Sequence, residues 1–485
     1  MSPRPSTYSN IRLSTLVLSL FVLVSSCKKG EQLPNMAPNT QLSIEKINLT
    51  GENRLNSTVN LSWFGTDVDG YIVGYEFKIN EGEWLPTNLQ DSTFLFNIDP
   101  DQDSTDIDFY VRAIDNEGVV DATPAYLRVP LKNSPPIVTF DEASLPADTT
   151  NLVFTFRYNA SDPDGNSTLK EIFLKANTGD WKAIDLNQKL ISLVPTDPKS
   201  TGAGTANVYY GLETTPAFTI DGYNNGGGNI IQLKALDIAN SESAIDSTPS
   251  TYVKPQTSDL LVVSGHNQTA SDEYTALVTA NYGGADVVEY LKDGGKYHPK
   301  FWDPTFKLLA SEYDKIFIHT EEGTTSNPLT GLDAKLLDFA APIIQYLIDS
   351  DKKILISTAF SNNADLSIIG GILSIDSFST SRGQAFFTND SLAVSADVDY
   401  ANLQPTNFLL AADPFYPALE AEVLYQARLT PSGVWQGPRT IAIRRRNSAS
   451  NVNLVLFTVE LHKLNKIKAN QNAVISKILN EAFNW

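Results

Sequence analysis

Three apolar runs in the C-terminal half of the chain end in polar residues whose side chains could do chemistry. These ends are Ser264-Gly265-His266, His319-Thr320-Glu321-Glu322 and Ser357-Thr358. Ligands of open α/β sheets bind beyond the carboxyl ends of the strands, so the three ends could line one crevice. Imidazole and carboxylate groups together can hold a metal ion or act as acid and base. The alternative is that they are solvated residues at strand ends.

Two groups of aspartates could bind a hard cation. Each group is drawn from two loops, and together they comprise Asp67, Asp69, Asp115, Asp162, Asp164 and Asp237. Three carboxylates at one spot repel one another unless a cation lies between them, and calcium accepts such oxygen ligands. The alternative is that these aspartates cap turns by accepting hydrogen bonds from nearby backbone N–H groups. The sequence predicts no bound cofactor, with calcium at these aspartates as the alternative.

The only cysteine, Cys27, follows a short apolar stretch near the N-terminus. Arg4 and Arg12 come before the apolar run 13–24, which is shorter than the about 20 residues that span a bilayer. This layout is typical of a secretory signal. The sequence Val24-Ser25-Ser26-Cys27 resembles the lipobox of bacterial lipoproteins, which implies cleavage before Cys27 and lipidation of its thiol. The alternative is a plain signal peptide with an incidental cysteine.

The residues after Cys27 bear on where such a protein would be anchored. Lys28 and Lys29 follow directly, and the stretch 27–31 resembles the start of lipoproteins from the Bacteroidetes group. This resemblance implies a lipid-anchored protein of the outer membrane, on its periplasmic or its external side. Two or three lipid chains hold a protein durably, because each buried CH₂ contributes about 0.8 kcal/mol.

The charge of the chain argues against nucleic acid as a partner. Residues 1–26 hold two arginines and no acidic residue, so 34 basic and 56 acidic residues would remain, a net charge of −22. Nucleic-acid backbones select for Lys and Arg, and anionic headgroups would repel such a chain. Membrane contact would therefore come through the N-terminal lipid. With no further cysteine, stability must come from large cores without disulfides.

The first half of the chain contains an internal duplication with strand periodicity. The stretches 66–84 and 111–125 recur as 161–181 and 233–250, a spacing of about 100 residues that indicates repeated modules. Apolar residues alternate with polar ones at period two, which predicts strands. The predicted core faces comprise Val59, Leu61, Trp63, Tyr71, Val73, Tyr75, Phe77, Ile79, Phe109, Val111 and Ala113 in the first module, and Leu152, Phe154, Phe156, Tyr158, Ile231, Leu233 and Ala235 in the second.

Short strands with Gly, Asp and Pro turns predict antiparallel β-sandwiches. An Asp-x-Asp-Gly turn and a later Ala-x-Asp occur in both modules. On these motifs the modules 39–131 and 134–254 resemble fibronectin type III-like or other immunoglobulin-like domains of bacterial surface proteins. The stretch 133–138, with its two prolines, predicts a stiff linker.

The last 230 residues or so predict a doubly wound α/β domain. Runs at 259–265, 315–320, 353–359, 440–445 and 453–461 are apolar on both faces, which is typical of buried parallel strands. A helix is expected over 330–349, with Thr330 and Asp333 as a capping pair and Pro342 as a kink or break. Another is expected over 467–483. One face of the first helix would carry Leu332, Leu336, Ile343 and Leu347, and one face of the second Ile467, Val474, Ile478 and Ala482.

The order of elements in 257–485 resembles the class I glutamine amidotransferase-like fold, a flavodoxin-like architecture. In active members a Gly-x-Cys-x-Gly turn follows the strand that corresponds to 353–358, but this chain has Ser357-Thr358-Ala359-Phe360. The family's later His-x-Glu pair is not matched, since Glu460 and His462 occur in reverse order. A thiol nucleophile is therefore missing, and glutaminase activity is excluded.

The sequence thus predicts a multidomain protein of two antiparallel β-sandwiches followed by a doubly wound α/β domain. Its parts are a signal peptide (1–26), a lipidated tether (27–38), the sandwiches (39–131 and 134–254) and the α/β domain (257–485). We expect a non-catalytic lipoprotein that presents the α/β domain to a protein or glycan partner, or as part of a surface assembly. The alternative is a cell-envelope hydrolase acting on glycan or peptide. That alternative requires His266 and His319 to lie within about 10 Å of each other.

Overall fold

A computed structural model describes residues 34–44, 58–96, 102, 104–321, 323–326, 331–360, 365–379, 385–409, 412–431 and 437–485. Cys27 and Glu322, both singled out above, lie outside these residues. The chain forms two compact units, Met1–Ser134 and Pro135–Trp485, which are described separately. Within the described ranges, no helix combines the length and the apolar character needed to cross a bilayer.

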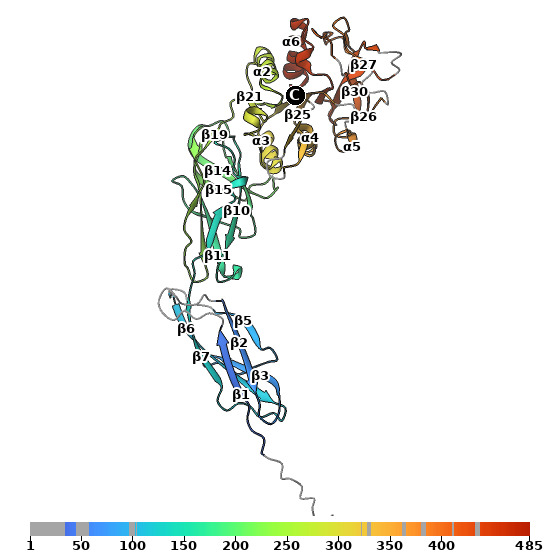
Figure 1. Ribbon diagram of the computed structural model, residues 1–485. Coiled ribbons are helices and arrows are strands. Elements are labelled where there is room, and N and C mark those ends of the chain that lie inside the picture. Colours follow the sequence, from blue (N-terminus) through green and yellow to red (C-terminus); the bar gives the residue numbers. More distant parts are fainter. Residues whose placement is uncertain are drawn as a thin grey trace, which may run out of the picture. The chain divides into compact units, whose positions relative to one another are not determined.

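The first unit is an antiparallel β-sandwich (Figure 1). Its two sheets enclose one core in which Trp63, Phe77, Phe94 and Phe109 are in ring contact. One sheet has the order β1(Asn39–Ile44)-β2(Thr58–Thr66)-β5(Asp91–Leu95), and the other β4(Leu85–Thr87)-β3(Ile72–Ile79)-β6(Ser104–Asp115)-β7(Ala125–Lys132). Sandwich architecture in this unit follows directly from these two sheets.

The period-two prediction is confirmed for most of this core and fails at one strand start. The predicted faces of β2 and β6 are buried, with Leu61, Phe109, Val111 and Ala113 fully inaccessible. Tyr71 and Val73, in contrast, are 67% and 51% exposed. The pairing of β3 with β6 shifts between Ile72 and Gly74. Because this bulge reverses the alternation, Ile72 packs on the core in place of its two neighbours.

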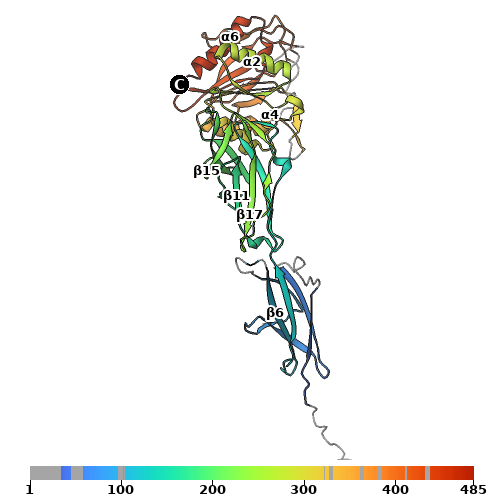
Figure 2. The same ribbon diagram turned by 90° about the vertical axis from the view of Figure 1, so that its left-hand side faces the viewer.

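The second unit begins with a sandwich of the same kind. Its predicted core residues are all buried, but Leu152 packs in the core of the α/β part and not in that of the sandwich. Figure 2 shows β11 and β17 side by side within it. Its larger sheet has the order β15(Phe218–Asn225)-β14(Gly202–Tyr210)-β13(Leu190–Pro195)-β10(Phe154–Ser161)-β8(Ile137–Phe140), facing β12(Lys182–Ile184)-β11(Leu169–Ala176)-β17(Ile231–Asp237)-β18(Asp246–Ser247). A small sheet, β16(Gly228–Asn229)-β19(Thr251–Lys254)-β9(Thr149–Asn151), completes it.

The duplication seen in the sequence has a structural counterpart at the first strand of each module. Asp121 accepts a hydrogen bond from the backbone N–H of Thr40 in β1, at 2.7 Å. At the corresponding place, Asp246 accepts one from the N–H of Phe140 in β8, also at 2.7 Å. Both aspartates belong to the repeated Asp-x-Thr-Pro motif. The motif therefore ties the first strand of each sandwich to the segment that follows β6 in the first module and to β18 in the second.

The rest of the second unit is built on a ten-stranded mixed sheet. Strands β21(Asp286–Glu289), β20(Leu260–Gly265), β22(Lys315–Thr320), β25(Lys353–Thr358) and β33(Val452–Phe457) are parallel and adjacent in this order. Numbered along the chain, this is the order 2-1-3-4-5 of flavodoxin-like sheets. The antiparallel part comprises β32(Thr440–Arg446), β29(Phe415–Pro417), β26(Ile375–Phe378), β30(Ala421–Ala427) and β28(Ala393–Ser395).

The prediction that 440–445 is a parallel strand is wrong. β32 pairs antiparallel with β33 and β30. Its first four residues, Thr440–Ile443, are buried as in the parallel strands, and they join the cores on both faces of the sheet. An apolar run of this kind indicates burial and leaves the strand direction open.

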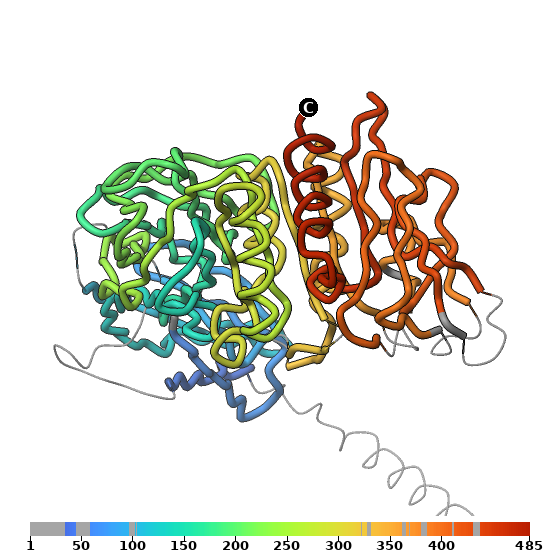
Figure 3. Tube along the Cα trace, turned by 90° about the horizontal axis from the view of Figure 1, so that it is seen from above, coloured from blue at the N-terminus to red at the C-terminus, as the bar shows by residue number. Residues whose placement is uncertain are grey.

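Helices cover both faces of the parallel strands. On one face α2(Gln268–Tyr282) packs beside α6(Lys468–Ser476), which continues as a π-helix over Lys477–Ala482 (Figure 3). The other face is covered by the π-helix Trp302–Phe306, α3(Lys307–Ser311) and α4(Leu336–Asp349), followed by the short α5(Leu366–Ile369). Short strand pairs, β23(Thr324–Ser326) with β24(Asp333–Lys335) and β27(Ala385–Phe386) with β31(Thr430–Pro431), lie outside the main sheet.

Two helix starts differ from the predictions. The helix expected from Thr330 begins at Leu336, and Asp333 lies in β24 while Leu332 is 70% exposed. Asp338 serves as the cap, because its carboxylate accepts from the N–H of Lys335. The helix continues through Pro342. In the last helix Val474 and Ile478 are buried as predicted, whereas Ile467 precedes the helix and is exposed.

Candidate functional site

The polar strand ends predicted to form a crevice lie at adjacent positions of the parallel sheet. Ser264 of β20 is in register with His319 of β22, and His319 with Ser357 of β25. In a 2-1-3-4-5 sheet the connections change direction between the first and third strands, here β20 and β22, and ligands bind at that point. The apolar runs in the sequence form the buried strands. The order in which these strands pair brings their polar ends together.

His266 and His319 are in direct contact. Their Nδ1 atoms are 3.0 Å apart, well inside the 10 Å that the hydrolase hypothesis requires. The other ring nitrogen of His266, Nε2, lies 2.8 Å from Oε1 of Glu460. Both imidazoles are buried, His319 completely. Glu460, His266 and His319 therefore form one continuous buried hydrogen-bonded chain.

The charge states of Glu460 and His319 follow from their surroundings. Burial by itself would raise the pKa of Glu460, but hydrogen bonds from His266 and Lys463 lower it to about 2. Burial, together with the neighbouring His266 and His462, holds the pKa of His319 well below its usual value. Glu460 is thus ionised and His319 neutral at physiological pH. When His266 carries its proton on Nε2, toward Glu460, its Nδ1 accepts from the Nδ1–H of His319.

Ser357 supports the site by holding its loop. Its hydroxyl accepts a hydrogen bond from the N–H of Leu461 at 2.9 Å and is 2.7 Å from the hydroxyl of Tyr274 in α2. Glu460 and His462 flank Leu461, at the start of a single 3₁₀ turn. The tyrosine ring also stacks on His319, with ring centroids 4.0 Å apart. Ser357 and Tyr274 therefore position both the loop and the imidazole.

The other predicted residues have local roles. The hydroxyl of Ser264 accepts from the N–H of His266 at 3.4 Å, and that of Thr358 donates to the carbonyl of Ala359 at 3.3 Å. Glu321 bonds to the carbonyl of Gly265 through its backbone N–H. The carboxylate that joins the histidines is that of Glu460, which the predicted crevice did not include. Glu322 lies outside the described residues.

In the sequence, Glu460 and His462 stand out only as a reversed His-x-Glu pair. Both follow the buried run of β33, a signal that could have added them to the strand-end group. Burial lowers the pKa of His462 to about 4. His462 and Glu460 both line a pocket of about 580 Å³, whose wall also includes Glu273, Ala359, Phe408 and Lys463. The buried polar cluster therefore borders, through Glu460 and His462, a cavity large enough for a ligand.

A metal ion is one ligand that these groups could hold. Ligand atoms of His266, Glu460 and His462 all lie within 4.8 Å of one another. Across the part of the chain that the structure describes, no other group of three His, Cys, Asp or Glu residues comes as close.

Comparison with known proteins gives similarity in the sandwich part of the chain. No family model matches the sequence, and no curated protein does. Similar solved structures include the fibronectin(III)-like modules of Clostridium thermocellum CbhA, at 15% identity and a TM-score of 0.17, covering 44% of this chain and 94% of that one. A two-domain fibronectin type III segment of chicken tenascin has 12% identity and a TM-score of 0.19, covering 44% and 98%.

A third similar structure is the PKD1 domain of Vibrio anguillarum Epp, with 12% identity and a TM-score of 0.16, covering 20% of this chain and 96% of that domain. TM-scores this low say nothing about function. The sandwich architecture of the modules rests on their own sheets and cores.

The aspartates considered for calcium act as turn caps. Asp115 accepts from the N–H groups of Glu117 and Val119, and Asp237 accepts from that of Ser241, each at 2.8 Å. Asp162 caps Asp164 in the same way. Among the described residues, neither trio brings its oxygens within the 4.8 Å spread of the histidine group. Calcium binding there stays a prediction.

The first trio also holds the segment that precedes β1. The side-chain amide of Asn35 donates to Asp115 at 2.5 Å, and the N–H of Met36 donates to Asp69 at 3.1 Å. These aspartates therefore fix the start of the first sandwich to its turn loops.

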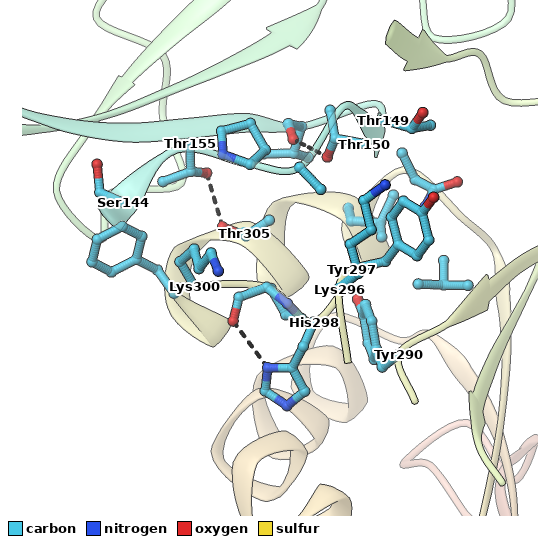
Figure 4. A pocket seen from close by; sticks show the side chains of 18 residues that line it. Ser144, Thr149, Thr150, Thr155, Tyr290, Lys296, Tyr297, His298, Lys300 and Thr305 are labelled. Carbon is cyan, nitrogen blue, oxygen red and sulfur yellow. Dashed lines mark hydrogen bonds between the residues drawn. The ribbon is translucent and has the colours of Figure 1, made fainter. Parts of the chain in front are cut away.

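A second cavity, of about 50 Å³, lies between the second sandwich and the α/β sheet (Figure 4). The hydroxyls of Thr155 and Thr305 bridge it at 2.9 Å. Beside it, Nδ1–H of His298 donates to the carbonyl of Pro299, and Nε2 accepts from the indole of Trp302. Because both ring nitrogens of His298 are hydrogen-bonded within the protein, we assign it a structural role at the contact between the second sandwich and the α/β part. This contact is called the joint below.

Proposed function

We propose that this chain is an exported, lipid-anchored protein whose β-sandwich modules carry an α/β domain that binds a protein or glycan ligand. The observation that carries the proposal is the gathering of three of the chain's four histidines and Glu460 beside the 580 Å³ pocket. Burying these groups is costly unless they are paired. Their concentration at the strand ends favours a ligand site.

The binding proposal is tested with the full chain carrying Cys27→Ser, which removes the lipidation site. We expect saturable binding to a component in a glycan array or an envelope pull-down. Phe408→Ala and His462→Gln, which alter the pocket wall, should weaken that binding at least tenfold. Lys199→Gln, an exposed position away from this pocket, is the matched control and should leave binding unchanged. Binding that is identical in all four proteins would locate the ligand elsewhere and refute the proposal.

A second candidate function is a cell-envelope hydrolase acting on glycan or peptide. The specific observation that favours it is the contact between His266 and His319, joined to an ionised Glu460. A carboxylate that orients an imidazole is the arrangement used by general bases. Hydrolysis of cell-wall glycan or peptide by the wild type, lost in Glu460→Gln and kept in Lys199→Gln, would support it. Equal turnover in Glu460→Gln and the wild type would rule this site out as the hydrolytic centre.

A further inference from the structure

The group formed by His266, Glu460 and His462 has the composition of a transition-metal site. It offers two imidazoles and one carboxylate, with one ligand atom of each within 4.8 Å of the others. Zinc ligands lie about 2.0–2.2 Å from the ion, so tetrahedral donors lie about 3.4 Å apart. The three side chains therefore have to draw slightly closer together to hold an ion. Imidazole suits zinc and related divalent metals, whereas magnesium and calcium prefer oxygen ligands.

The surroundings orient these donors as a metal site requires. A metal-binding histidine normally passes its second ring N–H to a hydrogen-bond acceptor. With a metal on Nε2, His266 carries its proton on Nδ1 and donates it to Nδ1 of His319, 3.0 Å away, the reverse of the metal-free tautomer described above. Lys463 binds the second oxygen of Glu460, so Oε1 is the oxygen on the histidine side. Ser357 fixes the turn that carries the other two donors.

Among the three proposed ligands, one buried ring nitrogen has no hydrogen-bond partner in the described residues; Nε2 of the neighbouring His319 is also unpaired. Nδ1 of His462 is inaccessible to solvent, and no group in the described residues hydrogen-bonds to it. Leaving a buried polar atom unpaired is unfavourable. The same imidazole lines the pocket of about 580 Å³, which gives an ion an entry path and room for a further ligand.

We propose that His266, Glu460 and His462 bind one divalent ion of the zinc class, with an open coordination position toward the pocket. Three protein ligands with an open position are typical of zinc sites that act on a bound molecule. This inference goes beyond the proposed function, because metal binding can be measured without knowing the ligand of the crevice.

The test uses tag-free full chain with Cys27→Ser, stripped with a chelator and titrated with zinc against a chromophoric competitor. We expect one ion per chain. Glu460→Gln, which keeps the side-chain shape, and His462→Gln should each weaken zinc binding at least 100-fold. His319→Gln should weaken it 10- to 100-fold, as for other partners of metal-binding histidines. His298→Gln replaces a buried histidine outside the group and serves as the matched control, with zinc affinity unchanged.

Thermal unfolding separates loss of metal binding from loss of folding. Zinc should raise the Tm of the wild type and of His298→Gln, because an ion that binds only the folded state stabilises it, and should leave the Tm of Glu460→Gln unchanged. X-ray absorption of the zinc-loaded wild type should show two imidazoles and one carboxylate. Less than half an equivalent of zinc, equal affinity in Glu460→Gln, or a different ligand set would overturn the proposal. Failure of the glycan or protein binding test would leave these results untouched.

Discussion

At the scale of single residues, the site depends on buried polar groups that are linked by hydrogen bonds but keep two unpaired ring nitrogens, Nε2 of His319 and Nδ1 of His462. Glu460, His266 and His319 are linked by contacts of 2.8 and 3.0 Å, and each is less than a tenth exposed. Such groups are costly to bury alone and stable when each has its partner. Residues such as Ser357 and Tyr274, which hold these groups in place, are therefore needed for the site to form.

Ser357 is the supporting residue that a single substitution tests best. Ser357→Ala would leave the N–H of Leu461 and the hydroxyl of Tyr274 without this buried partner. We expect it to lower the free energy of unfolding by about 1–3 kcal/mol, measured by urea denaturation. Ser448→Ala, at an exposed position, should change it by less than about 0.5 kcal/mol. An unchanged stability of Ser357→Ala would contradict the positioning role.

At the scale of elements, one aspartate in each sandwich accepts a backbone hydrogen bond from the first strand and holds that strand in place. Asp121 is 2% exposed and accepts three hydrogen bonds, two from Thr123 and one from Thr40 in β1. Asp246 accepts two, from Phe140 in β8 and from Ser247, in a more open setting. The repeated motif thus has a structural function within each module.

This difference predicts unequal effects of the same substitution. Asp121→Ala should raise hydrogen exchange in Asn39–Ile44 and cost about 1–3 kcal/mol, because it leaves buried donors unpaired. Asp246→Ala should have the smaller effect, on Ile137–Phe140 of the second module. Hydrogen-exchange mass spectrometry on the full chain measures both. Equal protection of β1 in Asp121→Ala and the wild type would show that this bond does not hold the strand.

The joint between the second sandwich and the α/β sheet should be sensitive to acid. Burial lowers the pKa of His298 from 6.5 to about 4, and its Nε2 must stay unprotonated to accept from Trp302. Below pH 6.5 the His298 imidazole is protonated in the unfolded chain, whereas in the folded chain it is protonated only below about pH 4. Stability should therefore fall as the pH drops through this window, by about 3 kcal/mol in total.

The His298→Gln variant isolates this effect from other titrating groups. Its free energy of unfolding, measured at several pH values between 7 and 4, should fall less steeply than that of the wild type. The difference between the two proteins should shrink as the pH decreases. Parallel pH profiles would show that His298 does not control the acid sensitivity.

At the scale of the whole molecule, we propose that the lipobox-like sequence before Cys27 directs this acidic chain, with a net charge of −20, to a membrane-tethered position outside the cytoplasm. Lipid chains on Cys27 would supply the attachment, since anionic headgroups repel an acidic protein. Labelling of the native protein with a radioactive fatty acid should place the lipid on the mature N-terminus. Cys27→Ala should abolish the label and shift the protein from the membrane fraction to the soluble one. Membrane retention of Cys27→Ala would contradict lipid anchoring.

The sequence by itself determined the strands and most of their buried faces, because alternation and apolar runs are local properties. It also picked out three of the strand ends, with His266, His319 and Ser357. It failed at the bulge near Ile72 and at the direction of β32, since both depend on the partner strand and not on the residue pattern.

Only the tertiary structure decided which carboxylate joins the histidines. Glu460 lies 194 positions from His266 and reaches it because β33 pairs with β25, which places both loops at one edge of the sheet. Glu321, next to His319 in sequence, was the nearer candidate, but its backbone rather than its carboxylate takes part in the contact with Gly265. Strand pairing is a long-range choice, so the composition of the site could be read only after the sheet order was known.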